Sequence, residues 1–327
     1  MKKTALITGI LGQDGPYLAK LLLEKDYKVY GMLRRYSNPN FSNLDWLGIT
    51  KDVELVDGDL TDEASLLRLV KQLRPTEVYN LAAQSFVGLS WDLAKLTTEV
   101  NALGVIYLLN AIKLFSPLSK FYQASTSEMY GGSKSEDGTQ DENTPFNPQS
   151  PYAIAKLNAY WITVNFRHSY GLFTANGILF NHESPLRGKQ FVTRKITDAV
   201  ARIKLGLAEK LELGNLDARR DWGFAGDYVE AMYRMLQHDV PDDFAVATGE
   251  SHSVREFVQR SFEHVDIADW ERYVISTSTH KRPTDVDHLH GNSEKALRIL
   301  GWRHTVDFSG LVEMMVDADM KRYTTGA

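Results

Sequence analysis

The 327-residue chain contains no cysteine. This absence excludes disulfides, thiolate zinc sites, iron–sulfur clusters and a cysteine nucleophile. The chain has no excess of positive charge either, because 37 lysines and arginines stand against 42 aspartates and glutamates, a net charge of −5. General binding of nucleic acid needs a basic surface, so this balance argues against a nucleic-acid partner.

Long apolar runs are scarce as well. The short stretch before Gly9 holds too few apolar residues for the core of a signal peptide, and no apolar run of about 20 residues follows. We therefore expect a cytoplasmic protein with no membrane partner. With 43% hydrophobic and 24% charged residues, the composition is that of an ordinary globular protein with a sizeable core.

The first half of the chain alternates between short apolar runs, typical of buried strands, and segments with helical apolar spacing. Strands are predicted at 4–8, 28–33, 53–56, 77–81, 121–125 and 173–180, and helices at 17–25, 63–73, 98–114 and 152–170. This alternation predicts an α/β fold with a Rossmann-type doubly wound parallel sheet.

The domain organisation follows from the same pattern. We expect a dinucleotide-binding domain over residues 1–180, to which 217–245 returns with a helix within 221–237. The less regular segments 181–216 and 246–327 are expected to form a smaller, mostly C-terminal substrate-binding lobe.

A glycine triplet follows the first predicted strand. Gly9, Gly12 and Gly15 form the pattern G-x-x-G-x-x-G between that strand and the first predicted helix. Glycine permits the tight turn and lets backbone N–H groups approach a pyrophosphate, which the positive end of the following helix attracts. A plain turn is the alternative, but the strand–turn–helix context favours a dinucleotide site.

The end of the second predicted strand bears on the choice of cofactor. NAD sites usually place an acidic residue there to hold the ribose 2′-hydroxyl, whereas this chain has Arg34 and Arg35. Paired guanidinium groups suit a 2′-phosphate and favour NADP; a solvated basic turn is the alternative. Asp59 and Leu60 follow the third strand, where an acid could contact the adenine.

Tyr152 and Lys156 are four residues apart at the start of a predicted helix, so they share one face. An ammonium beside a phenol is expected to lower the phenol's pKa from about 10 towards neutrality. The phenolate could then take the proton of a hydroxyl group while hydride leaves the same carbon for nicotinamide. Thr126, just past the fifth strand, could hydrogen-bond the same oxygen. On its own the pair could equally be a surface pair.

Several longer stretches carry a family resemblance. They read TGILGQDGPYL, GDLTD, YNLAAQS, FYQASTSEMYG, SPYAIAKLNAYW, NGILFNHESPLRG, FVTRKI, LGNLDARRDWG and RPTDVD. The chain resembles the extended short-chain dehydrogenases/reductases and, among them, the GDP-mannose 4,6-dehydratase family. The resemblance implies an NADP-dependent enzyme that converts GDP-mannose to a 4-keto-6-deoxy sugar nucleotide and so feeds deoxyhexose biosynthesis.

The resemblance also assigns residues. It makes Thr126, Glu128, Tyr152 and Lys156 catalytic. It places around the cofactor Gly9, Gly12, Gln13, Asp14, Gly15, Arg34, Arg35, Asp59, Leu60, Leu81, Ala82, Ala83, Gln84, Ser85, Val100, Tyr152, Lys156, His182 and Arg187. It places around the substrate Ser85, Glu128, Asn181, Val192, Lys195, Gly214, Arg220 and Arg282.

The chemistry of Glu128 supports a dehydratase independently. If the turn after the fifth strand is extended, Glu128 and Thr126 point the same way, because they are two residues apart. Oxidation at C4 makes the C5 proton acidic, and a carboxylate can remove it and then protonate the departing C6 hydroxyl. A 4-epimerase needs no such base. A related reductase or 4-epimerase of this fold, and an NADP-sensing protein without chemistry, remain alternatives.

Two positions depart from the family pattern. Leu11 stands where threonine is common, and Phe86 stands where histidine is common.

The one suggestive histidine cluster is His288-Leu289-His290 with Asp285 and Asp287, and it lacks ligand spacing, so we expect no functional metal.

The resemblance further implies self-association as a homotetramer, with a dimer as the fallback, through the loop of residues 36–43.

Overall fold

The computed structural model describes residues 2–277, 284, 286 and 288–325. Its centre is a seven-stranded sheet in the order β11-β6-β5-β4-β1-β2-β3, and every adjacent pair is parallel. The strands are β1 (Thr4–Thr8), β2 (Lys28–Leu33), β3 (Glu54–Asp57), β4 (Glu77–Asn80), β5 (Lys120–Thr126), β6 (Thr174–Leu179) and β11 (Asp243–Val246). The strand order reverses between β1 and β4, the place where open α/β sheets bind ligands.

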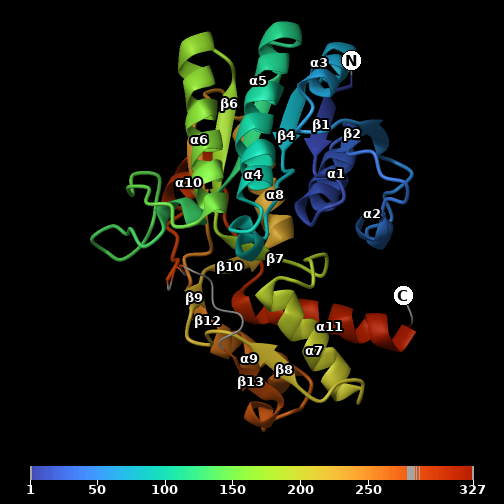
Figure 1. Cartoon of the computed structure of the whole chain (residues 1–327), viewed down its shortest axis with the longest axis vertical. Coiled ribbons are helices and arrows are strands. Elements are labelled where there is room, and N and C mark those ends of the chain that lie inside the picture. Colours follow the sequence, from blue (N-terminus) through green and yellow to red (C-terminus); the bar gives the residue numbers. More distant parts are fainter. Residues whose placement is uncertain (1, 278–283, 285, 287, 326–327) are drawn as a thin grey trace.

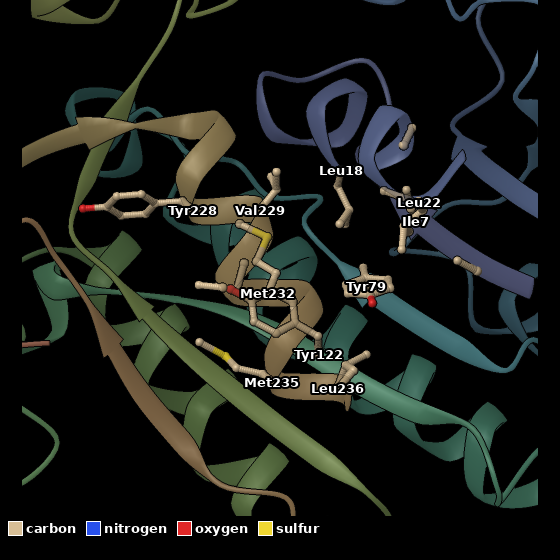
Figure 2. Packing of buried hydrophobic residues seen from close by; sticks show 14 of the residues in the cluster. Ile7, Leu18, Leu22, Tyr79, Tyr122, Tyr228, Val229, Met232, Met235 and Leu236 are labelled. Atoms are coloured by element: carbon tan, nitrogen blue, oxygen red, sulfur yellow. The ribbon is translucent and has the colours of Figure 1, made fainter. Parts of the chain in front are cut away.

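Helices cover both faces of this sheet. On one face lie α1 (Asp14–Glu24) and α8 (Ala225–Gln237), and Figure 2 shows Leu18 and Leu22 of α1 and Val229 and Met232 of α8 in one packed cluster with Tyr79. A second cluster unites α3 (Glu63–Leu73), α5 (Gly104–Phe115) and α6 (Pro151–Tyr170) with the sheet. The doubly wound fold predicted from the sequence is therefore confirmed.

Most of the remaining elements gather at the other end of the molecule (Figure 1). Their own apolar cluster joins α7 (Val192–Lys204), α9 (Val254–His264) and α11 (Phe308–Thr325). Three two-stranded pairs belong to this region: β7 (Asn181–Glu183) with β10 (Trp222–Phe224), β9 (Arg219–Arg220) with β12 (His252–Ser253), and β8 (Leu211–Leu213) with β13 (Val274–Ser276). The described chain also contains the short elements α2 (Ser42–Trp46), η1 (Val87–Ser90), α10 (Glu294–Leu300) and η4 (Trp270–Tyr273).

The sequence prediction missed several elements, among them α7, α9 and α11 in the less regular segments. The seventh strand, β11, was not predicted, because four residues after an acidic turn give no readable periodicity. The helix predicted at 98–114 instead begins at Ala94 and is interrupted: α4 (Ala94–Thr98) leads into the π-helical turn η2 (Glu99–Leu103) and then into α5. The proposed division into domains stays a prediction.

By length and composition alone, one helical run of the described chain, Ala94–Phe115, could cross a membrane. The run includes Lys95, Glu99 and Lys113, so it is not the unbroken apolar run of about 20 residues whose absence was expected. In the structure 44% of an 18-residue window of this run is buried, and the run packs against α3 and α6. Buried helices of globular cores satisfy the same length and composition test, so the run is weak support for a membrane partner.

Candidate active site

A cavity of about 610 Å³ opens at the carboxyl ends of the central strands, against β7, α7 and β9. Many of the predicted site residues line it: Gly9, Gly12, Gln13, Asp14, Gly15, Leu81, Ala82, Ala83, Ser85, Thr126, Glu128, Tyr152, Lys156, Asn181, His182, Arg187, Val192, Lys195, Gly214 and Arg220. Arg34, Arg35, Asp59, Leu60, Gln84 and Val100 are not among its lining residues, and Arg282 lies outside the described residues.

The glycine loop is shaped by backbone requirements. Gly9 has a φ of +73°, and a Cβ there would lie 2.8 Å from the backbone nitrogen of Ala82. A Cβ on Gly15 would lie 2.6 Å from the carbonyl oxygen of Gly9. The loop therefore holds the N-terminus of α1 at the edge of the cavity, an arrangement that suits a pyrophosphate.

The predicted cofactor residues outside the cavity have other partners. Arg34 and Arg35 are exposed beyond the end of β2, and the Arg34 guanidinium lies over the ring of Tyr36. The Asp59 carboxylate accepts hydrogen bonds from the backbone and hydroxyl of Thr61, at 2.9 and 2.8 Å. Leu60 is buried in the core beneath Gly104.

Gln84 is held by a residue that the sequence did not reveal. Its backbone N–H donates to Oδ1 of Asn101 at 2.8 Å, and Nδ2 of Asn101 donates to the Gln84 carbonyl at 2.9 Å. Asn101 lies in the π-helical turn η2, beside Val100. Such turns often occur at functional sites, but a single wide turn leaves no mark in helical periodicity.

Tyr152 and Lys156 lie in the first turns of α6. The helix starts at Pro151, and the Ser150 hydroxyl caps it by accepting a hydrogen bond from the backbone of Ala153 at 3.1 Å. The Lys156 ammonium donates to the carbonyl oxygen of Ala124 at 2.8 Å and lies 5.9 Å from the centre of the Tyr152 ring. The two side chains thus face the end of β5, where Thr126 lies.

The electrostatics of this pair correct one expectation. Burial raises the pKa of Tyr152 to about 12, and the nearby Glu128 charge adds to that rise, whereas a hydrogen bond with Thr126 opposes it. Burial also lowers the pKa of Lys156 to about 8. The prediction that Lys156 brings the phenol's pKa towards neutrality is therefore wrong for this structure. Both groups are removed from water, and the ammonium is engaged by a carbonyl.

Replacing Lys156 by Met should raise the free energy of unfolding at pH 7 by about 1 to 3 kcal/mol, because each pKa unit is worth about 1.4 kcal/mol and a lost hydrogen bond costs about 1. The folded pKa lies below the usual 10.5, so the folded state holds fewer protons between pH 8 and 10.5 and native stability rises across that window. In urea unfolding, the difference in free energy of unfolding between the variant and the native protein should therefore decrease from pH 8 to pH 10.5. The exposed Lys20→Met variant should be neutral, and a K156M protein less stable at every pH would contradict the account.

Thr126 and Glu128 reach the same cavity by a different geometry from the one predicted. The chain does not stay extended after β5; it turns into the 3-10 helix η3 (Ser127–Tyr130). The Thr126 hydroxyl caps this turn by accepting a hydrogen bond from the Glu128 backbone at 3.2 Å. The cap fixes the direction in which the chain leaves the strand, and both residues line the cavity.

The substrate end of the cavity carries cations on the smaller elements. Lys195 lies on α7, and burial lowers its pKa. Arg220 is buried on β9 beside Asp221, whose carboxylate accepts hydrogen bonds from the backbone of Thr248 at 2.8 Å and of Gly249 at 2.9 Å. This buried acid ties the segment that carries Arg220 to the turn after β11.

Histidines give no metal centre among residues 2–277, 284, 286 and 288–325, where no group of three His, Asp or Glu side chains could hold a metal ion. His288 Nε2 lies 3.1 Å from the Ser251 hydroxyl, and His290 Nε2 lies 2.8 Å from the Gly249 carbonyl. The predicted companions Asp285 and Asp287 lie outside the described residues.

Comparison with known proteins identifies the family. The family model described as GDP-mannose 4,6 dehydratase matches residues 6–315. GDP-mannose 4,6 dehydratase of Cricetulus griseus is 51% identical over 99% of this chain and 93% of its own length. The enzyme of Sinorhizobium fredii (strain HH103) is 47% identical over 98% of this chain and 97% of its own length.

The chain belongs to the GDP-mannose 4,6-dehydratase family. It is therefore a dehydratase, a hydro-lyase, and the resemblance inferred from its motifs is confirmed. Among solved structures, the UDP-glucose 4-epimerase of Thermus thermophilus in complex with NAD is 27% identical, with a TM-score of 0.85 over 97% of this chain and 98% of that chain. A dTDP-glucose 4,6-dehydratase of Streptomyces venezuelae has the same fold, with a TM-score of 0.86 at 23% identity over 99% of this chain and 98% of that chain.

Within this dehydratase, one cluster at the cavity was missed by sequence reasoning. The Arg187 guanidinium lies 3.0 Å from the buried Glu183 carboxylate and 3.7 Å from the centre of the Phe191 ring. Phe191 in turn meets Phe86 edge-on, with ring centres 5.9 Å apart. Phe86 thus packs against the ring over which the Arg187 guanidinium lies. Glu183 lies inside a motif that carried the resemblance, but only the fold reveals its pairing.

Proposed function

We propose that this dehydratase converts GDP-D-mannose to GDP-4-keto-6-deoxy-D-mannose with NADP as its bound cofactor. One observation carries the proposal: a hydroxyl, a carboxylate, a phenol and an ammonium line a cavity with the glycine loop at one end and Lys195 and Arg220 at the other. Relatives named for this reaction share about half of the residues over nearly the whole chain.

The residues present fit a nicotinamide dinucleotide. The glycine loop leaves no room for a Cβ at Gly9 or Gly15 and would take the pyrophosphate. The Thermus epimerase, which has the same fold, was solved with NAD. Preference for NADP rests on Arg34 and Arg35, which stand exposed where NAD sites usually have an acid. A bound nicotinamide would supply, in its oxidised form, the hydride acceptor for C4 and a positive charge favouring the phenolate and, in its reduced form, the hydride donor for C6.

Replacing Arg34 and Arg35 together by Ala should weaken NADP binding by about 10- to 100-fold, because hydrogen bonds to charged groups are worth about 1.5–3 kcal/mol. Binding of NAD, which has no 2′-phosphate, should change little. Calorimetric titration of both dinucleotides checks this, with the exposed Arg68→Ala variant as a matched control. Equal losses for the two dinucleotides would contradict the assignment.

The chain's own groups then divide the proton transfers. Since burial holds the Tyr152 phenol protonated in the free protein, it becomes a base for the C4 hydroxyl only after positive charge enters the cavity. We assign the Thr126 hydroxyl, which lines the same cavity, to a hydrogen bond with the same oxygen. Glu128 takes the proton from C5, which the C4 ketone has made acidic, and as the acid it protonates the leaving C6 hydroxyl. The proton that C5 regains when hydride reaches C6 therefore comes from solvent.

Incubation with GDP-mannose in D2O tests the function. Mass spectrometry should show a product that has lost one water and gained deuterium at C5. An unchanged mass with an inverted C4 centre would instead identify a 4-epimerase, and added hydrogen without loss of water a reductase. The absence of any turnover would favour an NADP-sensing protein.

Self-association as a homotetramer, with a dimer as the fallback, is part of the proposal. The loop of residues 36–43 is mostly exposed, and its Asn43 side chain donates to the Gly12 carbonyl at 2.8 Å, so it contacts the glycine loop. Elsewhere, α4, η2 and α6, which pack against one another, expose apolar side chains, namely Leu96, Leu103, Ile154 and Trp161. Light scattering should give the mass of four chains, and a monomer would contradict the proposal. A cytoplasmic location and the division into two lobes stay predictions.

A further inference from the structure

We propose that Asp14 and His182 are positioning residues, which as a carboxylate–imidazolium pair hold the glycine loop against β7. The two residues are 168 positions apart, and His182 Nε2 lies 2.9 Å from Oδ2 of Asp14. Asp14 opens α1, directly after the glycine loop, whereas His182 lies in β7 between Asn181 and the Glu183–Arg187 pair. The pair therefore links the loop expected to bind the cofactor to the segment expected to bind the substrate.

Two further contacts reinforce the same link. The Gln13 side-chain amide donates to the His182 carbonyl at 3.0 Å, and its oxygen accepts a hydrogen bond from the Ser184 hydroxyl at 3.0 Å. The same Gln13 amide donates to Oδ1 of Asp14 at 3.0 Å, so both carboxylate oxygens are engaged. The side chains of Gln13, Asp14 and His182 thus link the glycine loop to β7 through their hydrogen bonds.

The hydrogen bonds specify the charge state of His182. Its Nδ1 lies 2.8 Å from the Phe180 carbonyl, which can only accept, while Nε2 faces the Asp14 carboxylate. An imidazole whose two nitrogens both face acceptors satisfies them only as the imidazolium. The ring of Tyr228, from α8, stacks on it with centres 4.7 Å apart, which places a π face against the positive charge.

The pair's charges act on the catalytic groups. The Asp14 charge raises the pKa of both Tyr152 and Lys156, and the His182 imidazolium 2.9 Å from Asp14 carries the opposite charge. The other groups around the pair are Tyr17 of α1, Tyr122 of β5, Glu183 of β7, Arg187 after β7 and Tyr228 of α8. Loss of the imidazolium proton would leave a buried carboxylate uncompensated beside the catalytic phenol.

The pH dependence has a definite sign. Although burial opposes the charge of both partners, the pKa of His182 is raised and that of Asp14 is lowered by their pairing. The stabilisation from His182 is complete below its unfolded pKa of 6.5 and is lost as pH rises through its folded pKa. The contribution of Asp14 is present above 3.8 and is lost as pH falls through its folded pKa.

Two measurements on the full chain test the role of the Asp14–His182 pair. In protein labelled with 15N-histidine, the His182 resonance, assigned by its absence from His182→Asn, should stay that of an imidazolium above pH 6.5 and should titrate at lower pH in Asp14→Asn. A His182 resonance that is neutral at pH 6.5 in the native protein would overturn the proposal. This readout requires no turnover, so its outcome is separate from that of the proposed function.

The kinetic readout rests on the proposed dehydration. Asp14→Asn should lower kcat on the order of 10²-fold, as displacements of about 1 Å do, and should leave KM for GDP-mannose nearly unchanged. In the native protein kcat should fall as pH rises through the raised pKa of His182, because the Asp14 carboxylate then loses its counter-charge. Asp14→Asn, which has no such carboxylate, should lack this fall. The matched control Asp317→Asn breaks another His–Asp contact, 2.7 Å from His264 and outside the cavity, and should change neither quantity. An unaltered pH profile in D14N would overturn the positioning role.

Discussion

Replacing Glu128 by Gln should lower the rate of water loss from GDP-mannose by about 10²- to 10⁴-fold, the usual value of a positioned acid–base group. Glutamine keeps the size and the hydrogen-bonding reach of the side chain but can neither take the C5 proton nor give one to the C6 hydroxyl. The turn itself should survive, because its cap uses the Glu128 backbone and the Thr126 hydroxyl.

The same variant separates the two halves of the proposed reaction. Oxidation at C4 depends on Tyr152 and not on Glu128, so E128Q should still build up reduced-nicotinamide fluorescence on addition of GDP-mannose while releasing no dehydrated product. The exposed Glu136→Gln in the following loop is the matched control and should behave as native. Dehydration within tenfold of the native rate in E128Q would remove Glu128 from the mechanism.

Replacing Tyr152 by Phe should reduce turnover by about 10²- to 10⁴-fold and leave the affinity for GDP-mannose nearly unchanged. Phenylalanine fills the same buried volume but has no hydroxyl to accept the C4 proton. Here both oxidation and dehydration should stop, since the C4 ketone is needed before C5 becomes acidic.

Steady-state kinetics with a separate binding titration checks this result. Tyr170→Phe is the matched control, because Tyr170 ends the same helix and its side chain is 52% exposed. Native turnover in Y152F would contradict the catalytic assignment, whereas a matching loss in Y170F would point to damage of α6.

The sequence predicted the sheet, and it named residues that prove to line one cavity, because these features are local. A buried parallel strand is an apolar run, and the polar residues directly after it meet at one edge of the sheet. Thr126, at the end of β5, and Tyr152, at the start of α6, could be predicted as site residues in this way. The longer motifs added the family, which composition and spacing alone would not have given.

The rest depends on contacts between distant segments. The pKa of Tyr152 follows from burial by cavity walls that come from several parts of the chain, so the local Tyr–Lys spacing gave the wrong direction. The Asp14–His182 pair joins residues 168 positions apart. The Asn101 side chain can hydrogen-bond the Gln84 backbone because it lies in the π-helical turn η2. The strand β11 is recognisable as a strand only through its pairing with β6. None of these leaves a periodic signal.

The transfer of hydrogen from C4 to C6 within one turnover is the central claim, and GDP-mannose deuterated at C4 tests it most directly. The account predicts a product that has lost one water, carries the deuterium at C6 and forms without net consumption of NADPH. Deuterium found again at C4, or lost to an external dinucleotide pool, would contradict it.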